Sequence, residues 1–258
     1  MMKPVLYLRS VVYWLGFVVT TVVVGVLVIA ARPLPSDWRL WIARWWGVAN
    51  LALLKWICGL SYRVEGSGHI IKQKNAIVLC KHQSTWETIA LHAIIPGGRW
   101  VFKRELLRIP VFGWALACTD PIAIDRSAGR KAVRELVEKG TQKLERGKWV
   151  IIFPEGTRTA PGDDSQYKIG GAILAADSGY PVLPVAHNAG EFWPKHSFIK
   201  YPGCITVRIG DYIDTQDKKA AEILRETRDW IEAQMQDIAD PARWYRVKKP
   251  GAPAEKQA

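Results

Sequence analysis

The longest uncharged run of the chain lies near its N-terminus, where residues 11–31 contain no charged side chain. As a helix these residues would reach roughly 32 Å, which is enough to cross the hydrocarbon core of a bilayer. Their length and the poor cleavage site before Arg32 argue against a secretory signal. The residues from Arg32 to Pro35 then predict the end of the helix, because proline cannot continue it.

A second helix is expected to begin at Ser36 and Asp37, which can cap its first turn. Its apolar residues recur every three or four positions and therefore gather on one side. The tryptophans among them are Trp38, Trp41, Trp45 and Trp46. Tryptophan favours the interface between lipid and water, whereas a core helix of the globular part is the alternative. Residues 1–60 are therefore predicted to be a membrane-associated two-helix segment. Basic residues flank the apolar run on both sides, so one bilayer crossing and a hairpin in one leaflet both stay open.

From residue 61 onward, short apolar runs alternate with amphipathic stretches. Strands are predicted at residues 62–65, 75–80, 99–103, 121–126, 149–153, 180–186 and 205–209. Helices are predicted at residues 85–95, 105–118 (broken at Pro110 and Gly113), 129–146, 169–178 and 216–239. This alternation predicts an α/β fold over residues 61–240, with a mixed, mostly parallel sheet flanked by helices. Residues 241–258 are basic and rich in proline and alanine, and we expect a disordered tail there.

The charge of the chain narrows the possible partners. Lysine and arginine number 36 against 24 acidic residues, which gives a net charge of +12. Such a surface attracts anionic lipid, nucleic acid or acidic protein, or merely keeps the chain soluble. The apolar N-terminus and the lack of a nucleic-acid motif disfavour nucleic acid. The four cysteines are widely spaced without a metal or disulfide pattern, and we interpret them as buried thiols in a reducing cytosol.

The chemistry is expected where the strand at residues 75–80 ends, at the sequence Lys81-His82-Gln83-Ser84-Thr85-Trp86-Glu87. A neutral imidazole is a good proton acceptor near pH 7, and a carboxylate can hold it in the right tautomer. Five residues along one helix would place His82 and Glu87 roughly 140° apart, so they can meet only if His82 precedes the helix and Glu87 lies in its first turn. The alternative is a capping box, in which Glu87 returns to the backbone of Ser84.

A second polar motif follows the strand at residues 149–153, in the sequence Phe153-Pro154-Glu155-Gly156-Thr157-Arg158. Glycine lets a ligand approach the backbone, and the planar fork of Arg158 suits phosphate. Lys103 and Arg126 also stand at strand ends. Each of these charges alone is more often solvated, or forms a surface ion pair, but together they indicate an anion pocket.

These motifs resemble those of the 1-acylglycerol-3-phosphate acyltransferase family of glycerolipid synthesis, over roughly residues 60–215. The family's pattern Asn-His-x-Ser-x-x-Asp is matched at His82 and Ser84, but Lys81 stands in place of the asparagine and Glu87 in place of the aspartate. The other matching stretches are Ile124-Asp125-Arg126, Phe153 to Arg158 and Leu183-Pro184-Val185.

The resemblance implies a glycerol-3-phosphate acyltransferase-like fold and an acyl transfer to the 2-hydroxyl of 1-acyl-glycerol-3-phosphate. His82 would be the general base and Glu87 its partner. The residues implied at the phosphate and glycerol are Lys103, Arg126, Glu155, Gly156, Thr157 and Arg158. Acyl-CoA or acyl-carrier protein would supply the acyl chain, with no cofactor and no metal.

The resemblance also implies a location and leaves alternatives. The chain would lie in the inner (cytoplasmic) membrane, with its catalytic domain facing the cytosol and an anionic membrane surface beside it. Another lyso-lipid acceptor, such as an ornithine lipid or a lysophospholipid, and a non-catalytic phosphatidate-binding protein are the alternatives. The remaining histidines have no acidic residue at a suggestive spacing and are expected to have no catalytic role; they are His69, His92, His187 and His196.

Overall fold

The computed structural model describes residues 3–72, 75–95, 97–163 and 166–246. Within these residues, strands form one sheet in the order β1-β7-β6-β2-β5-β3-β4. The strands are β1 (Leu60–Glu65), β2 (Ile77–Cys80), β3 (Gly98–Lys103), β4 (Ile122–Ile124), β5 (Trp149–Ile152), β6 (Val182–His187) and β7 (Gly203–Ile209). Only the pairing of β6 with β7 is antiparallel among these strands. The prediction of a mixed, mostly parallel sheet is confirmed.

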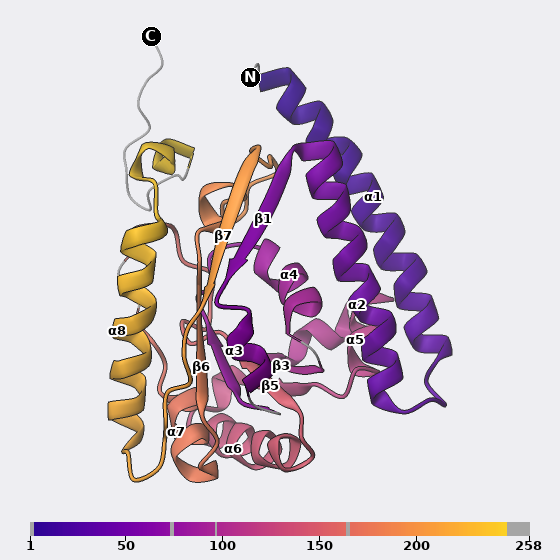
Figure 1. Ribbon diagram of the computed structural model, residues 1–258. Helices are drawn as coiled ribbons and strands as arrows, with labels where there is room; N and C mark the ends of the chain where they lie inside the picture. Colours follow the sequence, from indigo (N-terminus) through magenta and orange to yellow (C-terminus); the bar gives the residue numbers. More distant parts are fainter. Residues whose placement is uncertain (1–2, 73–74, 96, 164–165, 247–258) are drawn as a thin grey trace.

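Helices cover both faces of this sheet (Figure 1). They are α1 (Lys3–Ala30), α2 (Ser36–Leu53), α3 (Gly68–Lys72), α4 (Trp86–Ile94), α5 (Phe112–Ala117), α6 (Arg130–Glu145), α7 (Gly170–Ser178) and α8 (Ala220–Ile238). A π-helix at Leu54–Cys58 continues α2, and short 3-10 helices occur at Arg104–Arg108, Arg126–Ala128, Ala189–Glu191 and Pro241–Arg246.

The alternation of side chains along the strands produces two large apolar cores, one on each side of β2, and a small third cluster lies against α8. In β2, Val78 and Cys80 belong to the core on the side of α4, and Ile77 and Leu79 belong to the core on the side of α6 and α7. All four side chains are fully buried. A strand buried on both faces has no polar face, which explains why β2 is apolar throughout.

The N-terminal helices form an antiparallel pair on one flank of the molecule (Figure 1). Helix α1 ends at Ala30 and α2 begins at Ser36, as the proline-containing segment between them predicts. Trp46 Nε1 donates to Thr21 Oγ1 at 2.9 Å across the pair. By length and composition α1 can cross a membrane, and it is the one described helix with this property.

The predicted cap of α2 is wrong. Neither Ser36 nor Asp37 caps the helix, because both side chains bind Arg99 instead. Arg99 is fully buried, and its Nη2 donates to Ser36 Oγ at 3.1 Å and to Asp37 Oδ1 at 2.8 Å. Lys148 Nζ donates to the other Asp37 oxygen at 2.7 Å. A buried guanidinium needs such partners, so this tertiary demand overrides the local cap.

Other local predictions also need correction. Gly113 lies inside α5 and does not interrupt it. Part of the predicted tail is ordered, because Pro241–Arg246 forms a 3-10 helix and Trp244 Nε1 donates to Glu191 Oε1 at 3.1 Å. The rest of the tail, residues 247–258, lies outside the described residues. Cys204 is exposed and not a buried thiol.

Candidate active site

The two predicted motifs meet where β2 and β5 end. These strands are adjacent and parallel, so the residues after them leave the sheet at the same edge. The imidazole of His82 stacks on the ring of Phe153, with centroids 4.0 Å apart and planes inclined by 11°. Thr159 N donates to His82 O at 2.8 Å, which ties the second motif to the backbone of the first.

His82 and Glu87 are in contact. His82 lies in the loop before α4, Glu87 lies in the first turn of that helix, and His82 Nδ1 is 2.8 Å from Glu87 Oε1. The predicted geometry is therefore confirmed. Half of the capping box coexists with it, because Gln83 N and Ser84 N donate to the same oxygen at 2.9 and 2.8 Å. The N-cap residue of α4 is Thr85 and not Ser84. Ser84 Oγ in turn accepts from Trp86 N.

The charge state of this pair follows from its surroundings. Burial alone would raise the pKa of Glu87, but nearby His187 and the hydrogen bonds from His82 and Ser84 lower it below its usual value. An ionised carboxylate only accepts hydrogen bonds, so Nδ1 of His82 carries the proton. In the neutral imidazole Nε2 is then the nitrogen without a proton, and His82 lines a cavity. This arrangement suits a general base.

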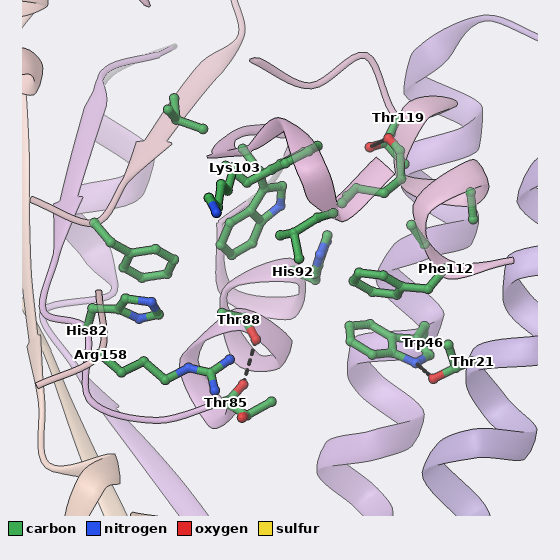
Figure 2. Close-up of a pocket in the computed structure, with 18 of the residues that line it drawn as sticks. Thr21, Trp46, His82, Thr85, Thr88, His92, Lys103, Phe112, Thr119 and Arg158 are labelled. Atoms are coloured by element: carbon green, nitrogen blue, oxygen red, sulfur yellow. Dashed lines mark hydrogen bonds between the residues drawn. The ribbon is translucent and has the colours of Figure 1, made fainter. Parts of the chain in front are cut away.

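The cavity has a volume of about 550 Å³, within the range of small-molecule sites. Figure 2 shows His82 and Arg158 at one end and Phe112 and Thr119 at the other. Apolar side chains of α1, α2, α5 and β3 line most of the wall. The cavity therefore offers a charged end beside the imidazole and a long apolar remainder.

The predicted cations gather at the charged end. Lys103, Arg126 and Arg158 all line the cavity, together with Gly156 and Thr157. Arg126 Nη1 donates to the carbonyl oxygen of Gly156. No carboxylate pairs with Arg126 or Arg158 within the described part of the chain, whereas Lys103 Nζ lies 3.2 Å from Glu105 Oε1. Unpaired guanidinium groups in a cavity suit an anionic ligand.

Known proteins are similar to this chain in sequence and in fold. A family model described as "Acyltransferase" matches residues 61–188. The chain is 38% identical to a 1-acyl-sn-glycerol-3-phosphate acyltransferase of Pseudomonas aeruginosa over 244 residues, which cover 92% of this chain and 94% of the relative. This chain belongs to that acyltransferase family.

Two further comparisons extend the family relationship to more distant enzymes. An enzyme of the same name from Cocos nucifera is 28% identical over 81% of this chain and 68% of its own length. The crystal structure of the 1-acyl-sn-glycerophosphate (LPA) acyltransferase PlsC from Thermotoga maritima matches with a TM-score of 0.76 and 26% identity, over 92% of this chain and 97% of that one. The chain is thus an acyltransferase enzyme with the fold of PlsC.

Glu155 departs from its predicted position beside the substrate. Its side chain is buried, and Oε1 accepts from His82 N at 3.2 Å and lies 3.5 Å from Lys81 Nζ. Burial raises its pKa to about 7. Glu155 is absent from the cavity wall, which its neighbours Gly156, Thr157 and Arg158 do line. The carboxylate therefore accepts a hydrogen bond from the backbone of His82 at a position outside the cavity wall.

Two of the other histidines lie beside acidic side chains that are distant in sequence. His187 Nε2 donates to Lys81 O at 2.8 Å and lies 3.8 Å from Glu87 Oε2. Burial lowers the pKa of His187, and the nearby carboxylate of Glu87 opposes that shift. His69 Nδ1 lies 2.7 Å from Asp211 Oδ1. The acidic partners of both are distant in sequence, so no spacing pointed to them.

Three titratable residues of the cavity wall were not predicted as site residues from the sequence. His92, Lys195 and His196 all line the cavity. The apolar helix around His92 resembles any core helix, and the segment containing Lys195 and His196 has no motif. Among the described residues, no cluster of three or more His, Cys, Asp or Glu side chains can hold a metal ion.

Proposed function

We propose that this enzyme transfers an acyl chain from a thioester to the 2-hydroxyl of 1-acyl-glycerol-3-phosphate, with His82 as the general base. The observation that carries the proposal is the His82–Glu87 contact at the charged end of an apolar cavity. The Pseudomonas aeruginosa relative bears the name of this activity. Acyl-CoA and acyl-carrier protein both present such a thioester, and either can be the donor.

The chemistry follows from the two ends of the cavity. His82 Nε2 takes the proton of the 2-hydroxyl, and the oxygen attacks the thioester carbonyl. The tetrahedral intermediate collapses by expelling the thiolate, which receives the proton from the imidazolium. Glu87 stabilises that imidazolium, because its carboxylate holds the Nδ1 proton. A positioned base of this kind contributes about 10²- to 10⁴-fold to the rate.

The charged end of the cavity is proposed to hold the phosphate of the acceptor. Arg126 and Arg158 are the main contacts, with Lys103 beside them and the backbone of Gly156 and Thr157 near the glycerol. The apolar remainder accommodates an acyl chain. The helix α1 embeds in the membrane, which we propose to be the inner membrane with the catalytic domain on its cytosolic side. A cationic surface favours that anionic boundary.

The decisive experiment measures phosphatidate formation by detergent-purified protein. Lysophosphatidate is supplied with a panel of acyl-CoA and acyl-carrier-protein thioesters of different chain lengths. We expect activity in the wild type and a loss of about 10²- to 10⁴-fold in His82→Ala. His69→Ala is the matched control, because His69 pairs with Asp211 outside the cavity wall and should retain full activity. Equal rates for His82→Ala and wild type would refute the base.

The acceptor is tested by Arg158→Gln. Charge-assisted hydrogen bonds contribute about 1.5–3 kcal/mol, so we expect the KM for lysophosphatidate to rise about 10-fold or more. The KM for a phosphate-free lyso-lipid, where any turnover is detected, should not change. If the enzyme prefers the phosphate-free acceptor and Arg158→Gln leaves that preference intact, the assigned acceptor is wrong.

A further inference from the structure

The residue before His82 is a lysine enclosed by the protein. Lys81 is 2% exposed, and its Nζ donates to Glu232 Oε1 of α8 at 2.7 Å. The same ammonium lies 3.5 Å from Glu155 Oε1 and 5.5 Å from the ring centroid of Tyr167. Tyr167 Oη donates to Glu232 Oε1 at 2.8 Å. A buried ammonium is costly unless it is paired, so these contacts account for the burial of Lys81.

This cluster touches the backbone of the catalytic histidine. Glu155 Oε1, the oxygen that faces Lys81, also accepts from His82 N at 3.2 Å. The carbonyl oxygen of Lys81 accepts from His187 Nε2 on the other side. The peptide between Lys81 and His82 is therefore held by two polar side chains, and one of them, Glu155, is itself held by Lys81.

The ion pair between Lys81 and Glu232, called the bridge below, joins two residues to which the family's motifs assign no role. Lys81 occupies the position where the family pattern has asparagine. Glu232 lies in α8, beyond residues 61–188 that the family model matches. Asparagine is shorter and uncharged, so it cannot pair with both carboxylates. The bridge is a feature of this chain that the general acyltransferase mechanism does not require.

The cluster contains more acidic than basic groups, so Lys81 is needed to offset the repulsion between the two carboxylates. One ammonium separates two buried or half-buried carboxylates, Glu155 and Glu232. Without that ammonium, two like charges would share the site, and Glu155 would turn away or take up a proton. Either response loosens the oxygen that accepts from His82 N. A displacement of about 1 Å at a catalytic group can cost on the order of 10² in rate.

We propose that Lys81 is a positioning residue for acyl transfer, and that α8 completes the active site by holding Lys81 against Glu155 through Glu232. This inference rests on the proposed role of His82 as the base. It assigns to the terminal helix a catalytic contribution without any contact to the substrate.

The experiment compares Lys81→Met and Glu232→Gln with the wild type across pH 6–9, using phosphatidate formation. We expect Lys81→Met to lower kcat at pH 7 about 10-fold or more, with the KM for lysophosphatidate changed less than about 3-fold. Part of the loss should be recovered at higher pH. Lys81 lowers the pKa of Glu155, so its removal raises that pKa and moves the acidic limb of the profile upward.

The two variants should move that limb in opposite directions. Glu232→Gln removes a negative charge but keeps an oxygen that can accept from Lys81 Nζ, so Lys81 stays in place and its charge acts on Glu155 alone. The acidic limb should therefore shift to lower pH. The titratable groups that interact with Glu155 are Lys81, Tyr167 and Cys80, and Glu232 reaches it through Lys81. The backbone amide of His82 also donates to Glu155. The double variant Lys81→Met/Glu232→Gln should regain part of the activity that Lys81→Met loses, because the like charges no longer oppose each other.

The control is Lys139→Met, because Lys139 is exposed on α6 and pairs only with Glu135 among the described residues. It should behave as the wild type. A Lys81→Met protein whose loss is the same at every pH, with no recovery in the double variant, would show a merely structural role. If Lys81→Met does not fold, an unmoved acidic limb in Glu232→Gln overturns the proposal. Absence of phosphatidate formation in the wild type would instead refute the proposed function.

Discussion

Glu87 combines two tasks in one oxygen. Oε1 accepts from His82 Nδ1 and from two backbone amides, so the residue orients the imidazole and closes the first turn of α4. An aspartate would withdraw the carboxylate by one carbon–carbon bond, about 1.5 Å. We expect Glu87→Asp to lower the initial rate of phosphatidate formation on the order of 10-fold. Glu87→Gln should cost about 10²-fold or more, because the imidazolium loses its counter-charge.

Glu135→Gln is a suitable control for this pair of variants, since Glu135 lies on α6 and pairs only with Arg104 and Lys139 among the described residues. A Glu87→Asp enzyme as fast as the wild type would mean that the length of this side chain is unimportant. Full activity of Glu87→Gln would show that the mechanism does not need the carboxylate of Glu87.

The difference between the residues that the sequence predicted and those it missed is one of distance along the chain. His82 and Glu87 are five positions apart, so helix geometry alone settled how they can meet. Lys81 and Glu232 are 151 positions apart, and their contact depends on how α8 packs on β6. No local pattern encodes that contact. Glu155 was assigned to the substrate for the same reason, because its partner Lys81 lies on another strand end.

His92 should make stability sensitive to acid. Burial lowers its pKa from 6.5 to about 4, so the folded protein holds it neutral. Below pH 6.5 the unfolded chain binds a proton that the folded protein does not bind, and this stability is lost as pH falls from 6.5 towards 4. We expect the Tm of the wild type to fall between pH 7.5 and pH 5 by at least about 2 °C more than that of His92→Phe. If the Tm of the wild type and that of His92→Phe fell equally, His92 would not be the group that makes stability sensitive to acid.

At the scale of elements, Lys200 is one of the residues that join α1 to the catalytic domain. Lys200 Nζ lies 3.9 Å from the ring centroid of Trp14 and 4.9 Å from that of Tyr13, both of α1. It lies 4.7 Å from the centroid of Trp193, whose carbonyl oxygen accepts from Ser84 Oγ at 2.6 Å. These contacts connect the apolar helix to the loop that contains His82.

Burial lowers the pKa of Lys200 to about 7, so its ammonium is retained at pH 6. At that pH we expect Lys200→Met to lower the free energy of unfolding by about 1–2 kcal/mol, because the ammonium no longer lies over desolvated aromatic rings. Thermal unfolding in detergent measures the effect. Lys131→Met, on the exposed side of α6, is the matched control and should leave the Tm unchanged. Equal Tm values for both variants would mean that the aromatic rings alone hold α1 in place.

The elements themselves were predictable, whereas their ends and connections were less so. Apolar runs of four or more residues became β2, β5 and β6, because a strand buried on both faces has no polar positions. The start of α2 was predicted at the right residues for the wrong reason, since Ser36 and Asp37 serve Arg99 from another part of the chain. Local preferences determine where elements form, and tertiary partners decide what polar side chains do.

At the scale of the whole molecule, the pair α1–α2 lies on one flank (Figure 1), and many of its exposed side chains are apolar. On α1, Leu15 is 64% exposed and Val19 is 59% exposed. On α2, Trp38 and Trp41 are also exposed, at 60% and 53%. Soluble monomers rarely expose so large an apolar surface, whereas the bilayer core favours aliphatic residues and its interface favours tryptophan. Side chains of the same two helices also line the cavity, so the proposed membrane contact and the cavity share these helices.

The double variant Leu15→Asp/Val19→Asp tests this arrangement. A charged side chain in a membrane helix costs about 2.5–3.5 kcal/mol, so the variant should no longer float with anionic phospholipid vesicles, which the wild type should do. Lys131→Asp/Arg134→Asp, on α6, introduces the same two acids without touching the outer surface of α1 and should still float.

Activity separates membrane docking from damage to the active site. The Leu15→Asp/Val19→Asp enzyme should lose turnover of lysophosphatidate in vesicles but retain most of it in detergent micelles, because Leu15 and Val19 do not line the cavity. Flotation that persists would mean that α1 is not the principal membrane contact. Equal losses in vesicles and micelles would mean that the outer surface of α1 supports the fold, and that the enzyme reaches its lipid acceptor by another surface.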